Sequence, residues 1–150
     1  MKYILLAITL LSLTLYAKPT LNDTLFLKRG IENSKDKIKN SPNLDSISVE
    51  GNLITINYLL NPAEITQIDN FKPTEKERTL MGNYYRMFLI NNFKNSFKNS
   101  SFVKKGYDIR FNVLWSDTHK RFFSYILLSD SYKKGDKWNG LYLFSFFQNH

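Results

Sequence analysis

The amino-acid sequence predicts an α+β fold: a single antiparallel sheet, made of two hairpins plus a C-terminal strand, with two helices packed on one face. Three observations predict it. Two stretches alternate apolar and polar residues around short turns, two others begin with helix-capping residues, and no spacing of strand, helix and strand requires a parallel sheet. The expected order of elements is α-β-β-α-β-β-β.

The composition is that of a globular protein with a substantial core. Of the 150 residues, 43% are hydrophobic and 15% are aromatic, which is too much for a disordered chain. A chain of this length is expected to form one domain. Cysteine is absent. Its absence excludes a disulfide framework, a thiolate zinc site, a cysteine nucleophile and a lipid-modified N-terminal cysteine.

Residues 1–17 resemble a secretory leader rather than part of the fold. Met1-Lys2 is a short positive start, residues 3–15 are mostly apolar, and Ala17 supplies the small residue of a cleavage site. An uncleaved anchor is the alternative, but the apolar run is shorter than the roughly 20 residues that a spanning helix needs. We therefore expect cleavage after Ala17, a single domain over residues 18–150 without a stable transmembrane anchor, and a periplasmic or secreted location.

The formal net charge of +8 is concentrated in the C-terminal part of the chain. Residues 18–90 carry ten basic and nine acidic side chains, whereas residues 91–150 carry ten basic and four acidic ones. Such a bias favours anionic partners. The chain also contains 16 Lys, 16 Asn and 12 Ile, a composition expected from an AT-rich coding sequence. A surplus of lysine then requires no partner.

The first helix is expected over residues 20–39. Thr20 can cap it, with Asp23 three positions further on. Its apolar stripe is weak and its second half is mostly polar, and the Asn-Ser-Pro-Asn sequence at 40–43 ends it.

The first hairpin is expected over residues 44–60. Gly51-Asn52 suits a two-residue turn with glycine at its first central position. With that turn, Val49 faces Ile54, Ile47 faces Ile56, Ser48 faces Thr55 and Ser46 faces Asn57. One face of the hairpin is then apolar and the other polar, and a slip of one residue would destroy both faces.

The second helix is expected after the capping-box sequence Thr74-Glu75-Lys76-Glu77 and should end near Lys98. The side chains expected on its core face are those of Met81, Tyr84, Tyr85, Phe88 and Leu89, with Asn92 and Ser96 continuing the same stripe.

The second hairpin is expected over residues 107–129, with its turn at 117–120. If Ser116 pairs with Arg121, then Trp115 meets Phe122, Phe111 meets Ile126 and Ile109 meets Leu128. This register places Trp115 inside, and it places Leu114, Phe123, Tyr125 and Leu127 on the opposite, partly exposed face. The last strand, residues 141–147, is apolar on both faces and is expected between other strands or under a helix.

Catalytic and metal-binding patterns are missing from the sequence. The two histidines, His119 and His150, fall in an expected turn and at the last residue. Three Ser-x-x-Lys matches occur without any companion motif. Glu75 and Glu77 are explained as favourable charges at a helix N-terminus. We therefore expect no enzyme, no cofactor and no metal, with a small secreted hydrolase as the least favoured alternative.

The layout is similar to that of small exported bacterial α+β proteins of unknown function. The residues that carry this resemblance are the leader, Gly51-Asn52 in the first hairpin, and Lys105-Gly106-Tyr107 at the entry to the second. Such proteins often contain a cysteine pair, which this chain lacks. The resemblance implies export, and it brings no catalytic residue.

The second hairpin and the loop after it combine basic and aromatic residues. Such a combination can bind phosphate, stack on rings or form a protein interface. The sequence therefore predicts a non-enzymatic binding or accessory protein of the bacterial envelope that contacts a protein partner. Binding to an anionic polymer or to lipid head groups is the alternative. The candidate binding residues are Arg110, Lys120, Arg121, Phe123, Tyr125, Lys133, Lys134, Lys137 and Trp138.

Overall fold

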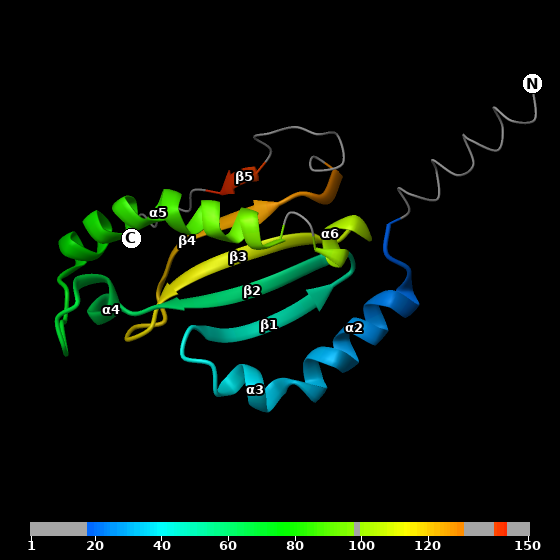
Figure 1. Cartoon of the computed structure of the whole chain (residues 1–150), viewed down its shortest axis with the longest axis horizontal. Helices are drawn as coiled ribbons and strands as arrows, with labels where there is room; N and C mark the ends of the chain where they lie inside the picture. The colour runs from blue at the N-terminus through cyan, green and yellow to red at the C-terminus, as the bar shows by residue number, and fades with distance from the viewer. Residues whose placement is uncertain (1–17, 98–99, 131–139, 144–150) are drawn as a thin grey trace, which may run out of the picture.

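The chain is described by a computed structural model that covers residues 18–97, 100–130 and 140–143. Four strands form the body of one sheet, and a short strand, β5 (Gly140–Leu143), pairs with the last of them. The strands lie side by side in the order in which they occur along the chain (Figure 1). The predicted α+β class is confirmed. The four long strands are β1 (Leu44–Glu50), β2 (Leu53–Leu60), β3 (Asp108–Trp115) and β4 (Arg121–Leu127).

The sheet is mixed, because β2 and β3 run parallel. The prediction of a fully antiparallel sheet is therefore wrong. Between these strands the chain forms α4 (Pro62–Thr66), the long helix α5 (Glu75–Phe97) and α6 (Ser101–Lys104). The long helix carries the chain back along the sheet, so β3 begins at the same end as β2, as a helical crossover between parallel strands requires.

The first predicted helix is present but divided into two. In α2 (Leu21–Asn33) the Thr20 hydroxyl accepts from the Asp23 N–H at 3.2 Å, and the Asp23 carboxylate accepts from the Thr20 N–H at 3.0 Å. This is the expected capping box. The polar remainder of the segment forms a separate short helix, α3 (Lys35–Lys39).

The hairpin of β1 and β2 has the predicted register. Val49 pairs with Ile54, and Ser48 pairs with Thr55. Gly51 adopts a φ of 56°, a left-handed conformation that glycine allows at the first central position of a tight turn. Val49 and Ile54 are buried, so the apolar face of the hairpin does face the core.

The capping box of α5 also forms, but the buried face of this helix differs from the prediction. The Thr74 N–H donates to the Glu77 carboxylate at 2.7 Å. Leu89 is buried as expected, whereas Tyr84 and Phe88 are 81% and 59% exposed. Asn92 and Ser96 are exposed as well. The side chains that α5 packs into the core are those of Met81, Tyr85, Leu89, Ile90, Phe93 and Phe97.

The hairpin of β3 and β4 differs from the predicted register by one residue. Ile109 pairs with Leu127, Phe111 with Tyr125, and Val113 with Phe123, and the register shifts again beyond Val113. Because neighbouring side chains in a strand point to opposite faces, a slip of one residue moves every side chain of β4 to the other face. Phe123, Tyr125 and Leu127, expected on a partly exposed face, therefore lie in the core beside Trp115.

The last strand is described from Gly140 to Leu143. Residues 144–147, over which the predicted strand continues, lie outside the described residues. β5 pairs antiparallel with β4 and has the last place in the strand order. Of the two places predicted for this strand, the one between two other strands is therefore wrong for the described residues, and the one under a helix stays a prediction.

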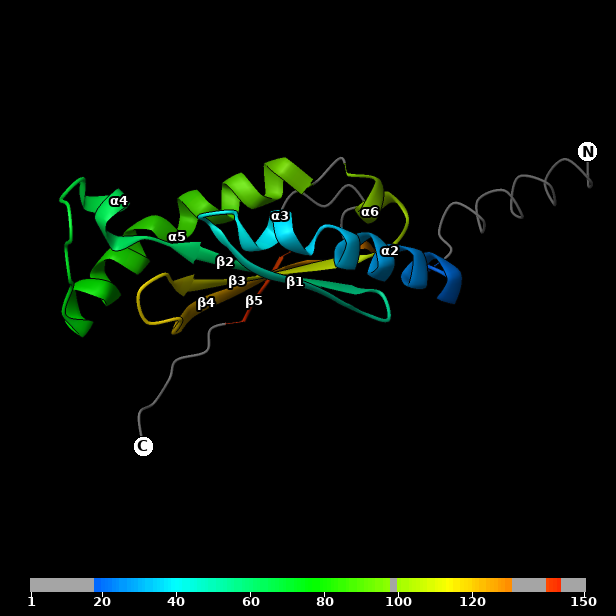
Figure 2. The same cartoon turned by 90° about the horizontal axis from the view of Figure 1, so that it is seen from below.

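The helices all lie on one side of the sheet (Figure 2), as predicted. Two buried clusters result. α5 and α6 cover β3 and β4 around Phe111 and Tyr125, and α2 packs through Leu27 and Ile31 beside Val49 and Ile54. No helix of the described chain combines the length and the apolar character needed to cross a membrane.

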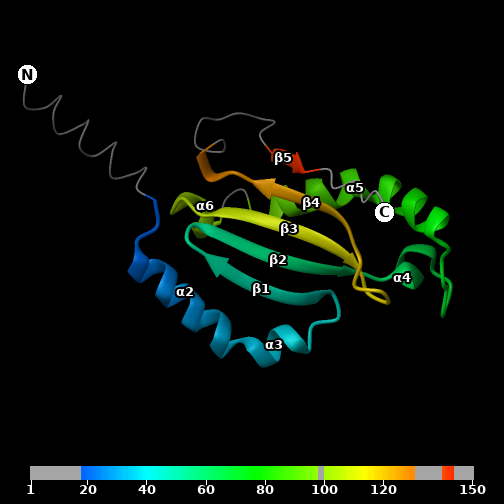
Figure 3. The same cartoon turned by 180° about the vertical axis from the view of Figure 1, so that it is seen from behind.

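The side of the sheet without helices faces the viewer in Figure 3. A row of hydrogen-bonded polar side chains crosses this side of the sheet. Ser124 donates to the Asn112 side-chain oxygen at 2.6 Å, and the Asn112 amide donates to Asn57 at 2.8 Å. The Asn57 amide then donates to Ser46 at 2.7 Å. The row joins β4, β3, β2 and β1, and it satisfies the buried Asn112 and Ser124.

Candidate functional site

Those predicted binding residues that the structure describes do not form one surface. Phe123 and Tyr125 are 3% and 2% exposed, so their rings cannot reach a partner. Their expected exposure was wrong because of the register of β4. Four more of the predicted residues, Lys133, Lys134, Lys137 and Trp138, lie outside the described residues.

The three remaining cations lie in different surroundings. Arg110 is half-buried on the helix-free face, where it pairs in register with Thr55 and Ile126. Lys120 is exposed, and its Nζ lies 3.1 Å from the carboxylate of Glu75. Arg121 is exposed at the beginning of β4. Of these three cations, Lys120 and Arg121 lie together, and they are neighbours in the sequence.

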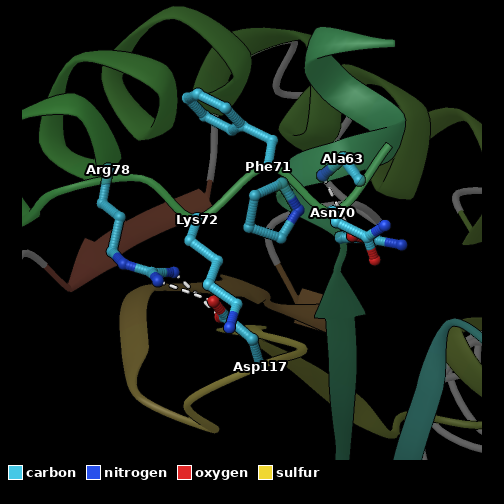
Figure 4. Close-up of a pocket in the computed structure, with 8 residues that line it drawn as sticks. Ala63, Asn70, Phe71, Lys72, Arg78 and Asp117 are labelled. Carbon is cyan, nitrogen blue, oxygen red and sulfur yellow. Dashed lines mark hydrogen bonds and ion pairs between the residues drawn. The ribbon is translucent and has the colours of Figure 1, made fainter. Parts of the chain in front are cut away.

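The turn between β3 and β4 is held to α5 by an ion pair that the sequence did not predict. Arg78 donates two hydrogen bonds to Asp117, at 2.8 and 2.6 Å, in a bidentate geometry (Figure 4). The Arg78 guanidinium also lies over the Trp115 ring, 5.5 Å from its centroid. Arg78 is only 8% exposed. A buried guanidinium needs both contacts, because desolvation of an unpaired charge is costly.

This ion pair forms one wall of an open hollow of about 480 Å³. The hydrogen bonds from Arg78 lower the pKa of Asp117, and those hydrogen bonds raise the pKa of Arg78, while burial acts against both shifts. The two groups stabilise each other's charged forms. They hold the turn in place, and the lowered pKa of Asp117 is the opposite of the raised carboxyl pKa that a general acid needs. The other lining residues are Asn61, Pro62, Ala63, Asn70, Phe71 and Lys72.

His119 lies close to the first hairpin. It adopts a φ of 53°, and its Nδ1 lies 3.4 Å from the Asp45 carboxylate at the start of β1. The side chains of both residues are partly exposed. Within the described parts of the chain, no three His, Asp or Glu side chains are grouped as a metal site would require.

The outer face of α5 carries a stripe of exposed apolar side chains. Leu80, Tyr84, Met87 and Phe88 are 61%, 81%, 48% and 59% exposed. Their spacing places them on one side of a helix over two turns. We call these four residues the α5 stripe. It lies opposite the buried residues Gly82 and Leu89 of the same helix.

The sequence contains the signal for the α5 stripe, but the signal is ambiguous. Leu80, Tyr84, Met87 and Phe88 have helical spacing, and so do the core residues Met81, Tyr85 and Leu89. A helix that is apolar on both sides gives no preferred phase, so the periodicity does not indicate which side faces the sheet.

The comparisons with known proteins add no relative. No protein-family model matches the chain, and neither a curated protein nor a solved structure matches it. The resemblance to small exported bacterial proteins therefore stays a prediction, and the function has to be argued from the surface itself.

Proposed function

We propose that this protein is an exported, non-enzymatic binding protein, and that it binds a protein partner through the α5 stripe. One observation carries the proposal: a helix that already packs one face on the sheet carries large apolar side chains on the other. A group of large apolar side chains left exposed on one surface normally marks an interaction site. The export half of the proposal rests on the leader sequence.

The chemistry of the stripe favours a protein over other partners. Interface centres are rich in Tyr, Phe and Met and poor in Lys and Glu. The stripe has this composition. The exposed residues beside it on the helix include the uncharged Asn83, Asn91 and Asn95, with Lys76 and Glu77 at its N-terminal end. Burial of one such large apolar side chain stabilises a complex by about 1.5–3 kcal/mol.

The sequence favours the second hairpin as the binding surface, whereas this proposal uses the α5 stripe. The basic and aromatic residues of the second hairpin are divided between the core, a surface ion pair and the helix-free face. The α5 stripe is continuous, and it lies on a rigid helix that is capped at its N-terminus.

Site-specific photo-crosslinking in the cells that make the protein tests this proposal. Benzoylphenylalanine replaces Tyr84 in one variant and Phe88 in a second, and it replaces the exposed Lys37 of α3 in a control. We expect the same partner at positions 84 and 88 and not at 37. The partner, once identified and purified, should bind the Tyr84→Ser/Phe88→Ser variant at least about tenfold more weakly than the wild type.

The salt dependence of binding and the identity of the crosslinked protein show whether the proposal is wrong. Binding through apolar side chains should change little as ionic strength rises, whereas binding through lysine and phosphate should weaken steeply. A steep salt dependence, equal crosslinking at all three positions, or a crosslink only to a second copy of this chain would each contradict the proposal.

A further inference from the structure

Apolar side chains are also exposed at the end of the molecule where α2 begins. Leu21, Leu25 and Phe26 on α2 are 75%, 44% and 81% exposed, and Phe102 on α6 is 36% exposed. The two helices lie at the same end of the sheet, beside the turn between β1 and β2 (Figure 1). This surface is separate from the α5 stripe.

Basic side chains lie on the same two helices, in the residues before α2 and directly after α6. All of them are exposed. Four of them have no ion-pair partner in the described parts of the chain, and the fifth, Lys105, lies 3.6 Å from Asp23. The Asp23 carboxylate also accepts a hydrogen bond from the Thr20 N–H in the cap of α2. The five cations are Lys18, Lys28, Arg29, Lys104 and Lys105. With Leu21, Leu25, Phe26 and Phe102 they form what we call the α2–α6 end.

Buried contacts hold the two helices together at this end. Tyr107, which follows α6, is 2% exposed, and its hydroxyl lies 3.5 Å from the Thr24 hydroxyl of α2. The ring of Tyr107 also contacts that of Phe102 edge to face, with centroids 6.5 Å apart. Thr24 donates to the carbonyl of Gly51 in the first hairpin turn at 3.1 Å. The exposed side chains are therefore presented on a packed support.

We propose that the α2–α6 end binds an anionic lipid surface. Leucine and phenylalanine side chains that project from a helix insert to the level of the head groups, and flanking lysines and arginines bind the lipid phosphates. Protein interfaces are depleted in lysine. Five cations around four apolar side chains therefore fit a membrane better than a protein. The proposal does not depend on the partner of α5, since it uses different residues.

Sedimentation with lipid vesicles tests the inference. The exported protein, with its N-terminus defined by mass spectrometry, is mixed with vesicles of phosphatidylcholine alone or with added phosphatidylglycerol. We expect binding only to the anionic vesicles. Each Lys or Arg near an anionic leaflet changes affinity by about fivefold, so Lys28→Glu/Arg29→Glu should weaken binding by at least about 30-fold. Leu25→Ser/Phe26→Ser should weaken it by at least about tenfold.

Two controls make the result specific. Lys37→Glu/Lys39→Glu makes the same change of net charge on the exposed α3 and should leave vesicle binding unchanged. Leu25→Ser/Phe26→Ser should leave binding to soluble polyphosphate unchanged, because that ligand has no apolar layer. Thermal melting of all variants verifies that they are folded. Absence of binding to anionic vesicles, equal weakening by both charge reversals, or full binding by Leu25→Ser/Phe26→Ser would overturn the inference.

Discussion

At the scale of single residues, Arg78 and Asp117 connect the two halves of the chain. Arg78 comes from the start of α5, and Asp117 comes from the turn that follows β3. Their contact fixes the turn in which Lys120 approaches Glu75. The contact joins residues 39 positions apart, so no local sequence pattern indicates it.

Asp117→Asn should lower the free energy of unfolding by about 1 kcal/mol at neutral pH. A charged hydrogen bond is normally worth more, but the Asp117 side chain is 37% exposed and water screens it. The pKa of Asp117 is lowered in the folded state by the hydrogen bonds from Arg78. The contribution of the Asp117 carboxylate to the free energy of unfolding is therefore present above the unfolded-state pKa. It is lost as the pH falls through the folded-state pKa.

Urea unfolding from neutral to acidic pH measures this effect. The difference between wild type and Asp117→Asn should shrink towards acidic pH. Asp69→Asn, in an exposed loop, should change neither the stability nor its pH dependence. A difference that is constant with pH would show that the carboxylate charge contributes nothing.

At the scale of elements, α5 has apolar residues on both sides, and one glycine marks the side that meets the sheet. A Cβ on Gly82 would lie 2.9 and 3.0 Å from two ring carbons of Phe122. Phe122 is itself stacked on Trp115, with ring centroids 4.8 Å apart, so its ring has little freedom to move. By contrast, a Cβ on Gly30 of α2 would have no neighbour within 4 Å.

The two glycines give a matched pair of substitutions. Alanine stabilises a helix relative to glycine by roughly 0.5–1 kcal/mol. We expect Gly30→Ala to stabilise the protein by about that amount. Gly82→Ala should destabilise it by about 1 kcal/mol, because overpacking outweighs the same gain. Chemical denaturation of both variants measures this, and stabilisation by Gly82→Ala would contradict the close packing of α5 on β4.

The sequence predicts those elements that are defined by neighbouring residues. Thr20 with Asp23 and Thr74 with Glu77 mark helix starts, and Gly51 sets the register of the first hairpin because its turn has only two residues. The turn of the second hairpin is longer and is followed by a register shift, so counting residues across it fails. The wrong faces assigned to Phe123 and Tyr125 follow from that one step.

At the scale of the whole molecule, one face of the sheet is covered by helices, and two separate exposed surfaces result. The α5 stripe and the α2–α6 end share no residue, and they belong to different helices. Substitutions at distant sites without shared contacts have independent effects.

We therefore expect the two binding activities to be separable. Tyr84→Ser/Phe88→Ser should bind anionic vesicles as the wild type does, and Lys28→Glu/Arg29→Glu should crosslink at position 84 as the wild type does. Vesicle sedimentation and photo-crosslinking of both variants check this. Loss of both activities in either variant would mean that the surfaces act as one, or that the variant is misfolded, which thermal melting distinguishes.

The sequence by itself determined both helix starts, the first hairpin and the α+β class, because each depends on composition or on contacts between residues a few positions apart. Only the tertiary structure decided the parallel pairing of β2 with β3, the side of α5 that faces solvent and the ion pair of Arg78 with Asp117. The physical reason is that these features depend on which distant segments pack together. The hydrophobic effect has no preferred direction, so an apolar side chain is stabilised by burial against any apolar surface. Its presence in the sequence therefore does not specify which surface it will cover.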